Sequence, residues 1–137
     1  MHYICNRKTN RAARTVAILN YNDMNNLFTT LTMIAAANPA GFTYNVQTNE
    51  MQTSGYAVAL AETQGSHGLE GLESVLNLVM SSACPASCVG GWLDSETGLY
   101  YYDATVITDD LQEAIQLGRI NKQIAIFDLN TMTEIRL

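Results

Sequence analysis

Two cysteines and one histidine are the residues of this sequence that could act as a nucleophile and its base. Cys84 and Cys88 stand four positions apart, and His67 lies upstream between Ser66 and Gly68. A cysteine thiolate attacks as a nucleophile when a nearby imidazole accepts its proton and a third group orients that imidazole. One hypothesis that stays open is therefore a small cysteine-dependent enzyme, built on Cys84 or Cys88 with His67 as the base.

The same thiols are also ligands that zinc prefers. A structural zinc site needs about four ligands, and besides these two cysteines the sequence offers only Cys5, His2 and His67. The spacing of Cys84 and Cys88 is also wider than that of the usual paired-cysteine motif. We therefore expect two small buried or loop thiols, with no metal site and no cofactor.

A basic segment and a glycine-rich segment could bind phosphate. Four of the seven cations stand within the first 14 residues: Arg7, Lys8, Arg11 and Arg14. Guanidinium groups donate paired hydrogen bonds to phosphate oxygens, and backbone amides beside His67 and Gly68 would do the same at a helix start. The alternative for the basic segment is a solvated hairpin turn. The alternative for the glycine-rich segment is that its glycines only allow the backbone conformation that this part of the chain needs. A phosphorylated small molecule is thus one candidate ligand for these residues.

An aromatic hairpin is the clearest candidate for a binding surface. Trp92 and the run Tyr100, Tyr101 and Tyr102 fall on two predicted strands that reverse at Ser95-Glu96-Thr97-Gly98. Because side chains alternate along a strand, Tyr101 faces away from Tyr100 and Tyr102. One face then belongs to the core, and the other is partly exposed or covered by another subunit. Such rings could stack a base or anchor a protein partner.

The carboxylates form no evident acid–base pair. Five of them are expected in turns and at helix caps, where they accept hydrogen bonds from backbone amides: Asp94, Glu96, Asp103, Asp109 and Asp110. No two are spaced so that one would act as general acid and the other as general base. We therefore assign no catalytic residue among them.

The composition is that of one folded domain. The chain has 137 residues, of which 47 % are hydrophobic and 15 % charged. A chain of this length buries a sizeable core without disulfides or metal, and its composition lies far from that of disordered segments. Residues 1–137 are expected to form a single domain.

Charge is distributed unevenly along the chain. The net charge is −6, and after the basic segment only Arg119, Lys122 and Arg136 stand against thirteen acids. An acidic body repels the phosphates of nucleic acids, so only the N-terminal segment would attract them. Nucleic acid is therefore disfavoured as a partner.

Nothing in the sequence indicates export or membrane insertion. The first residues lack the charged, apolar and small order of a secretory signal. No apolar run approaches the roughly 18 residues of a membrane span. Three cysteines, an odd number at irregular positions, fit reduced thiols. We expect a cytoplasmic protein that does not contact a membrane.

Helical spacing of apolar residues predicts about three helices. The first begins near Asp23 and is stopped at Pro39. The second is capped by Ser66 and buries Leu69 together with the apolar residues that follow it on the same face. The third is capped by Asp109, which precedes a glutamine at the capping-box spacing.

Alternating or continuous apolar runs predict short strands in the other segments: 3–5, 15–19, 42–46, 56–60, 89–94, 99–106, 124–127 and 134–137. The strands at 42–46 and 56–60 are expected to be antiparallel, with a bulge at Gly55. The strand at 124–127 is expected to be buried. The result is an α+β fold with a mainly antiparallel sheet of about six or seven strands, packed by about three helices.

A longer pattern in the second half of the chain resembles a known group of proteins. It comprises Gly90-Gly91-Trp92-Leu93-Asp94, the run from Thr97 to Asp103, and the segment from Asn121 to Leu129, with Glu62-Thr63-Gln64 upstream. This pattern is similar to that of small uncharacterised α+β proteins of bacterial viruses and mobile elements. The resemblance runs from residue 56 onward. It implies a setting and carries over no catalytic residue.

Together these observations favour a non-enzymatic binding protein. Small acidic proteins in the setting that the resemblance implies often act by binding, and they include inhibitors of host defence that block a host protein or sequester a nucleotide-type signal. The resemblance therefore implies an accessory factor of this kind. We also expect a homo-oligomer that covers the sheet edges and the aromatic hairpin. The cysteine-dependent enzyme is the alternative.

Overall fold

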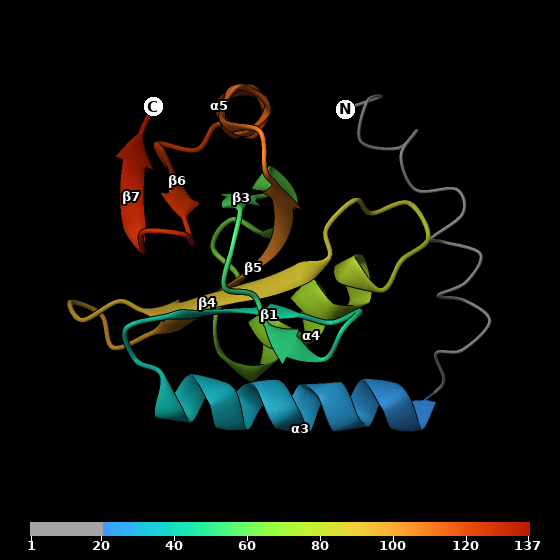
Figure 1. The fold of residues 1–137 in the computed structure, drawn as a ribbon. Coiled ribbons are helices and arrows are strands. Elements are labelled where there is room, and N and C mark those ends of the chain that lie inside the picture. Colours follow the sequence, from blue (N-terminus) through green and yellow to red (C-terminus); the bar gives the residue numbers. More distant parts are fainter. Residues whose placement is uncertain (1–20) are drawn as a thin grey trace.

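One antiparallel sheet of seven strands organises residues 21–137, the part of the chain that the computed structural model describes (Figure 1). The strands are β1 (Phe42–Asn45), β2 (Glu50–Met51), β3 (Tyr56–Ala59), β4 (Cys88–Leu93), β5 (Tyr100–Thr108), β6 (Ala125–Asp128) and β7 (Thr133–Arg136). Their order across the sheet is β2-β1-β4-β5-β3-β6-β7. The prediction of a mainly antiparallel sheet of this size in an α+β fold is confirmed.

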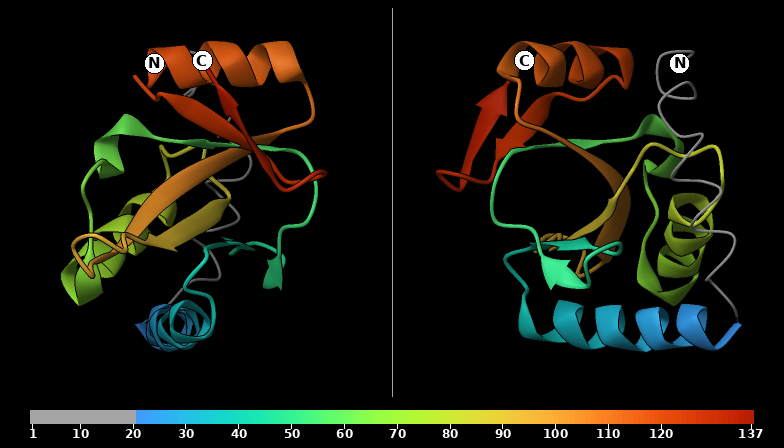
Figure 2. Two further views of the ribbon diagram at one scale, coloured as in Figure 1. Left: turned by 90° about the vertical axis from the view of Figure 1, so that its left-hand side faces the viewer. Right: turned by 45° about the vertical axis from the view of Figure 1, so that its right-hand side comes forward.

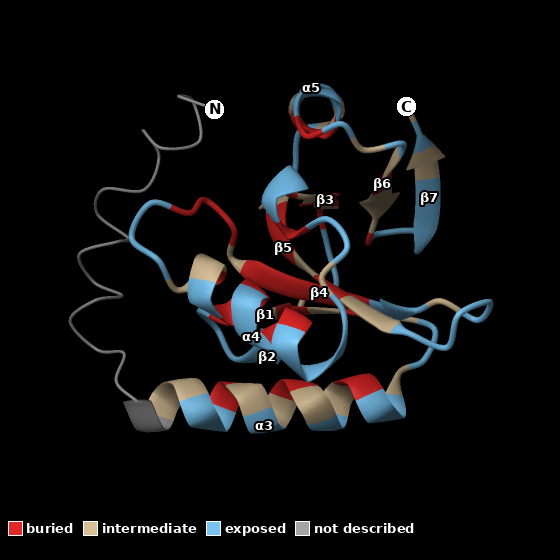
Figure 3. Cartoon of the chain, turned by 180° about the vertical axis from the view of Figure 1, so that it is seen from behind, coloured by how far each residue is buried: buried red, intermediate tan, exposed pale blue. Residues whose placement is uncertain are grey.

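Three helices of the described chain pack against this sheet: α3 (Tyr21–Ala37), α4 (Gly68–Val79) and α5 (Leu111–Ile120). A short 3-10 turn, η1 (Ala61–Thr63), precedes α4. The helices α3 and α5 lie at opposite ends of the molecule (Figure 1), and α4 lies against β4 and β5 (Figure 3). Among the described residues, no helix combines the length and the apolar character needed to cross a bilayer.

The register of the central strands sorts their side chains onto two faces. Side chains alternate along a strand and stand beside those directly opposite on the next strand. The helix face carries the residues that join the buried core: Phe42, Tyr44, Val58, Val89, Tyr102, Ala104 and Val106. The far face carries the alternate residues: Thr43, Cys88, Gly90, Trp92, Tyr101, Asp103, Thr105 and Ile107.

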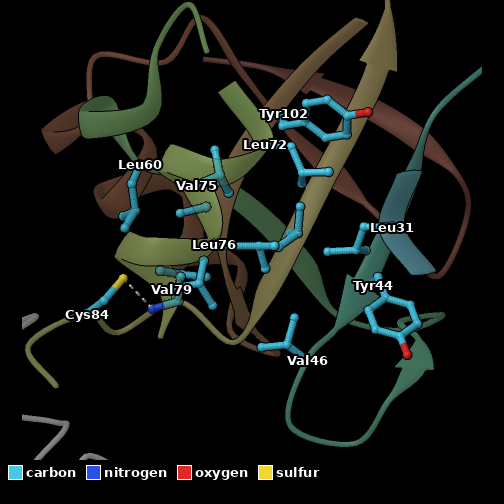
Figure 4. Close-up of a cluster of buried hydrophobic side chains, with 14 of the residues drawn as sticks. Leu31, Tyr44, Val46, Leu60, Leu72, Val75, Leu76, Val79, Cys84 and Tyr102 are labelled. Atoms are coloured by element: carbon cyan, nitrogen blue, oxygen red, sulfur yellow. Dashed lines mark hydrogen bonds between the residues drawn. The ribbon is translucent and has the colours of Figure 1, made fainter. Parts of the chain in front are cut away.

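The core lies between the helix face and the helices. Leu72, Val75 and Leu76 of α4 are almost fully buried, and Leu31 of α3 joins the same cluster, which also contains Tyr44 and Tyr102 (Figure 4). Each fully buried aliphatic side chain contributes roughly 1.5–3 kcal/mol relative to an exposed one. The apolar stripe of α4 therefore fixes this helix on one face of the sheet.

Two adjacent glycines in β4 let both faces pack closely. A Cβ at Gly91 would overlap the ring of Phe42 and would stand 2.8 Å from Cε1 of Tyr100 on the helix face. A Cβ at Gly90 would stand 2.7 Å from Oδ1 of Asp103 on the far face. Both distances are shorter than ordinary contacts to a Cβ, so a side chain at either position would force its neighbour to shift: the rings of Phe42 and Tyr100 at Gly91, and the carboxylate of Asp103 at Gly90.

The sheet is curled (Figure 2). From Met51 to Tyr56 the chain makes five steps, which span at most about 18 Å, whereas β2 and β3 would lie about 19 Å apart in a flat sheet with three strands between them. The connecting segment passes on the side of the sheet opposite α4 (Figure 2). At its end Gly55, with a φ of 90°, lies against Ile107 of the far face.

Three predictions about strands are wrong. The segments at 42–46 and 56–60 are antiparallel but are not neighbours, because the β4–β5 hairpin lies between β1 and β3. Gly55 forms no bulge: it precedes β3 and adopts the positive φ of a tight bend. Ile124, expected in a buried strand, is exposed, since β6 starts one residue later.

The predicted caps of α4 and α5 are each displaced by one residue, and α3 is already helical at Tyr21, two residues before the predicted start at Asp23. The N-cap of α4 is His67, whose side chain accepts no capping hydrogen bond, and Ser66 instead pairs with β5. Leu69 is 59 % exposed because it precedes the buried stripe. The N-cap of α5 is Asp110, not Asp109. The predicted strands at 3–5 and 15–19 lie outside the described residues.

The glycine contact gives a first prediction. Gly91→Ala forces a methyl group into the rings of Phe42 and Tyr100, so we expect the free energy of unfolding to fall by about 2–3 kcal/mol. Gly98→Ala is the control, since nothing lies within 4 Å of its Cβ position and only its positive φ is strained. Urea denaturation measures both, and equal losses would contradict the steric account.

The cap of α5 gives a second prediction. Oδ1 of Asp110 accepts hydrogen bonds from the amides of Gln112 and Glu113, at 2.9 and 3.2 Å. Asp110→Ala should therefore lower the free energy of unfolding by about 1 kcal/mol. Asp109→Ala, at the exposed neighbouring position, should change it by less than about 0.5 kcal/mol. A larger effect at Asp109 would place the cap one residue earlier.

Candidate functional site

Three rings form a continuous row on the far face: Trp92, Tyr101 and His67. The rings of Trp92 and Tyr101 are stacked, with centroids 5.1 Å apart and an interplanar angle of 21°. The imidazole of His67 lies on the other side of Tyr101, 5.6 Å away and tilted. Trp92 is 47 % exposed, His67 is exposed and Tyr101 is half-buried. We call these residues the aromatic row.

The backbone explains why these rings meet. Trp92 stands directly opposite Tyr101 in the β4–β5 hairpin. On the other side of β5, beyond the end of β3, the chain pairs again: His67 forms a bridge with Tyr101, and the amide of Tyr102 donates to the carbonyl of Ser66. Directly opposed residues hold their Cβ atoms about 5 Å apart. Three adjacent backbone segments therefore present one ring each.

The other two tyrosines of the run lie on the helix face, which confirms the predicted alternation. Tyr102 is buried, and Tyr100 donates a hydrogen bond from its hydroxyl to the carbonyl of Asn38, at 2.7 Å. Both pack against Phe42, with centroids 6.3 and 6.4 Å away. Burial, with the neighbouring Tyr102 as a second cause, raises the pKa of Tyr100 to about 12. These two rings belong to the core.

A carboxylate lies beside the aromatic row. Asp103 follows Tyr101 by two positions on β5, so its side chain is on the same face, and it leans over Gly90. The hydroxyl of Thr105 donates a hydrogen bond to Oδ1 of Asp103. Desolvation by the surrounding protein raises the pKa of this carboxyl above its ordinary value, and the bond from Thr105 opposes that shift.

Asp103 was not predicted as a site residue. The sequence expectation places it in a turn, and that expectation is wrong, since β5 extends from Tyr100 to Thr108 and Asp103 lies in its interior. Two signals were available: its spacing of two from Tyr101, and the hairpin register that sets it opposite Gly90. Diagonal neighbours across two strands lie about 7–8 Å apart, which brings Trp92 within reach of the same ligand.

The predicted pairs of cysteine and histidine are not brought together. Cys88 stands opposite Thr105, four residues along β5 from the position of His67, or about 13 Å at the rise of a strand. Cys84 follows the far end of α4, which extends about 18 Å from the helix start. Both cysteines are buried, and Nδ1 of His67 contacts the carbonyl of Gly65.

The predicted phosphate site is divided between two parts of the chain. Arg7, Lys8, Arg11 and Arg14 lie outside the described residues. Gly68 is exposed at the start of α4, with a φ of 68°, next to His67. The first turn of this helix also carries Glu70, whose charge opposes an anion at the same place.

Within residues 21–137, no group of three or more His, Cys, Asp or Glu side chains is placed to hold a metal ion. Comparisons with protein-family models, curated proteins and solved structures find no match to this chain. The chemistry of the site lies in its own groups: two stacked rings, an imidazole and a carboxylate. Aromatic faces attract planar groups and cations, and a carboxylate accepts hydrogen bonds from N–H donors.

The raised pKa of Asp103 gives a third prediction. The pKa of the Asp103 carboxyl is higher in the folded chain than in the unfolded chain. The folded state therefore binds this proton more tightly, and ionisation of the carboxyl destabilises the fold as the pH rises from the unfolded pKa through the folded pKa. Asp103→Asn removes this cost and keeps an acceptor for Thr105. We expect the variant to be more stable than the wild type at pH 7, with the difference shrinking as pH falls toward 3.8. Thermal unfolding at several pH values measures it; a less stable variant at pH 7 would contradict the cause given.

Proposed function

We propose that this chain is a non-enzymatic binding protein whose protein partner docks on the aromatic row. One observation carries the proposal: Trp92, the single tryptophan of the chain, is half exposed and stacked flat on Tyr101. The helices of the described chain pack on the other face of the sheet, so the fold does not need these rings for its core.

The energetics of protein interfaces support this reading. Tryptophan and tyrosine are the residues most enriched among those whose removal costs more than about 2 kcal/mol of binding free energy. Both side chains lose little conformational freedom on binding because each has two torsions. Here the stacking between Trp92 and Tyr101 orders the rings in advance, which lowers the entropic cost of binding further.

The setting proposed for this binding is the interior of a bacterial cell that carries a virus or mobile element. There the protein would block a host defence protein. A nucleotide-type signal is the other ligand that stacked rings would accept. The aromatic row fits it less well, because Asp103 and the excess of thirteen acids over three cations in residues 21–137 repel phosphate.

Assembly of the chain with itself stays a prediction, and β7 gives it a place. Among residues 21–137 this strand is the last of the sheet and pairs only with β6, so its outer edge offers a place for a strand of a second copy. Strands β5, β3 and β6 separate β7 from Trp92, so pairing there would leave the aromatic row accessible. Sedimentation velocity tests this, and a monomer at every concentration would exclude it.

Loss of the stacked rings should abolish partner binding. We expect a protein captured by the wild type from host cells, then purified, to bind Trp92→Ala about 30-fold or more weakly, as a contribution of about 2 kcal/mol requires. Tyr101→Ala should have a similar effect. Met33→Ala is the matched control: it also removes an exposed apolar side chain, but from α3.

Isothermal titration calorimetry measures these affinities, and circular dichroism confirms that each variant folds. A partner that binds Trp92→Ala and Tyr101→Ala as tightly as the wild type would contradict the proposal. So would a catalytic activity of the wild type that Cys84→Ala or His67→Ala abolishes.

A further inference from the structure

We infer that the aromatic row and Asp103 together receive an arginine side chain of a basic protein partner. This inference rests on the proposed binding role of the far face and names the chemistry of the group that binds there. Trp92 and Tyr101 supply flat aromatic surface, and Asp103 supplies an acceptor at its edge.

The geometry suits a guanidinium group. A guanidinium is planar, stacks on aromatic faces and donates paired hydrogen bonds from its edge to one carboxylate. Cation–π attraction acts within about 6 Å of a ring centroid. Asp103 lies about 7 Å along β5 from Tyr101, so a guanidinium over the ring can reach the carboxylate with its edge.

The carboxylate lacks a cation in the part of the chain described. The one ion pair between described residues joins Arg136 to Glu134 on β7. Asp103 is held by Thr105, with Gly90 below it, and is desolvated without a compensating charge. An arriving cation supplies that charge, so binding would recover part of the desolvation cost.

Charge complementarity selects a basic partner over other occupants. Residues 21–137 carry thirteen acids and three cations, a balance that attracts positively charged proteins. At this site a second copy of the same acidic body would bring like charge against Asp103, so it fits the aromatic row less well than a basic protein does. Lysine fits less well than arginine, because an ammonium neither stacks on Trp92 nor donates in a fork.

The test uses the full-length chain and three short peptides: acetyl-Gly-Arg-Gly-amide, the same peptide with citrulline, and the same peptide with lysine. Citrulline keeps the planar shape of arginine without its charge. Because the chain has one tryptophan, the indole N–H signal of Trp92 in an NMR spectrum reports on the site directly. Ionic strength is held constant throughout each titration.

We expect the arginine peptide to shift the Trp92 signal in a saturable way, with an affinity at least about tenfold above those of the citrulline and lysine peptides. Asp103→Asn should reduce the affinity for arginine to that for citrulline. Glu96→Gln removes the same charge from the exposed turn of the same hairpin, and it should change the affinity by less than about twofold.

Three results would overturn the inference. One is that the arginine peptide binds no more tightly than the citrulline peptide, or does not bind at all. Another is an arginine affinity that Asp103→Asn leaves unchanged. The third is a Trp92 signal that moves when Arg7, Arg11 and Arg14 are all replaced by alanine, since the chain's own arginines would then occupy the site. If one of these results is obtained and Trp92→Ala still fails to bind the natural partner, the arginine inference is wrong but the proposed function stands. If Trp92→Ala binds that partner as tightly as the wild type, the inference and the proposed function both fail.

Discussion

Two neighbouring residues without side chains, Gly90 and Gly91, set what each face of the sheet can hold. On the helix face, Gly91 admits the rings of Phe42 and Tyr100 so close to β4 that a methyl group would not fit. On the far face, Gly90 lets Asp103 lean across the strand. Because successive residues point to opposite sides, one glycine serves each face. The aromatic core and the carboxylate therefore share one strand without competing for space.

This division separates stability from binding. The helix face carries the buried apolar side chains that hold α3, α4 and α5, and Tyr100 and Tyr102 join them. The far face bears features that a core would not keep: a half-exposed tryptophan and a desolvated carboxylate without a cation in the described chain. Groups that cost folding free energy are typical of functional sites, where a ligand supplies the missing interaction.

Local patterns predicted much of this arrangement. The periodicity of α4, the reversal before Tyr100 and the alternation of the three tyrosines all depend on neighbours in sequence, and each is confirmed. The sequence could not place the β4–β5 hairpin between β1 and β3, because strand order depends on contacts between distant segments. For the same reason the sequence does not predict His67 beside Tyr101. Asp103 is a different case, because it falls within the predicted strand at 99–106 and the hairpin register sets it opposite Gly90. What the sequence could not supply is the desolvation of its carboxyl.

The most direct measurement of this account is an NMR titration of the Asp103 side-chain carboxyl carbon, in the wild type and in Gly90→Ala. The wild-type carboxyl should titrate above its ordinary value of 3.8, because the protein around β4 desolvates it. In Gly90→Ala the added methyl group pushes the carboxylate toward water, so its pKa should fall back toward that value. A wild-type pKa at or below 3.8, or one that Gly90→Ala leaves unchanged, would contradict the role given to the glycine pair.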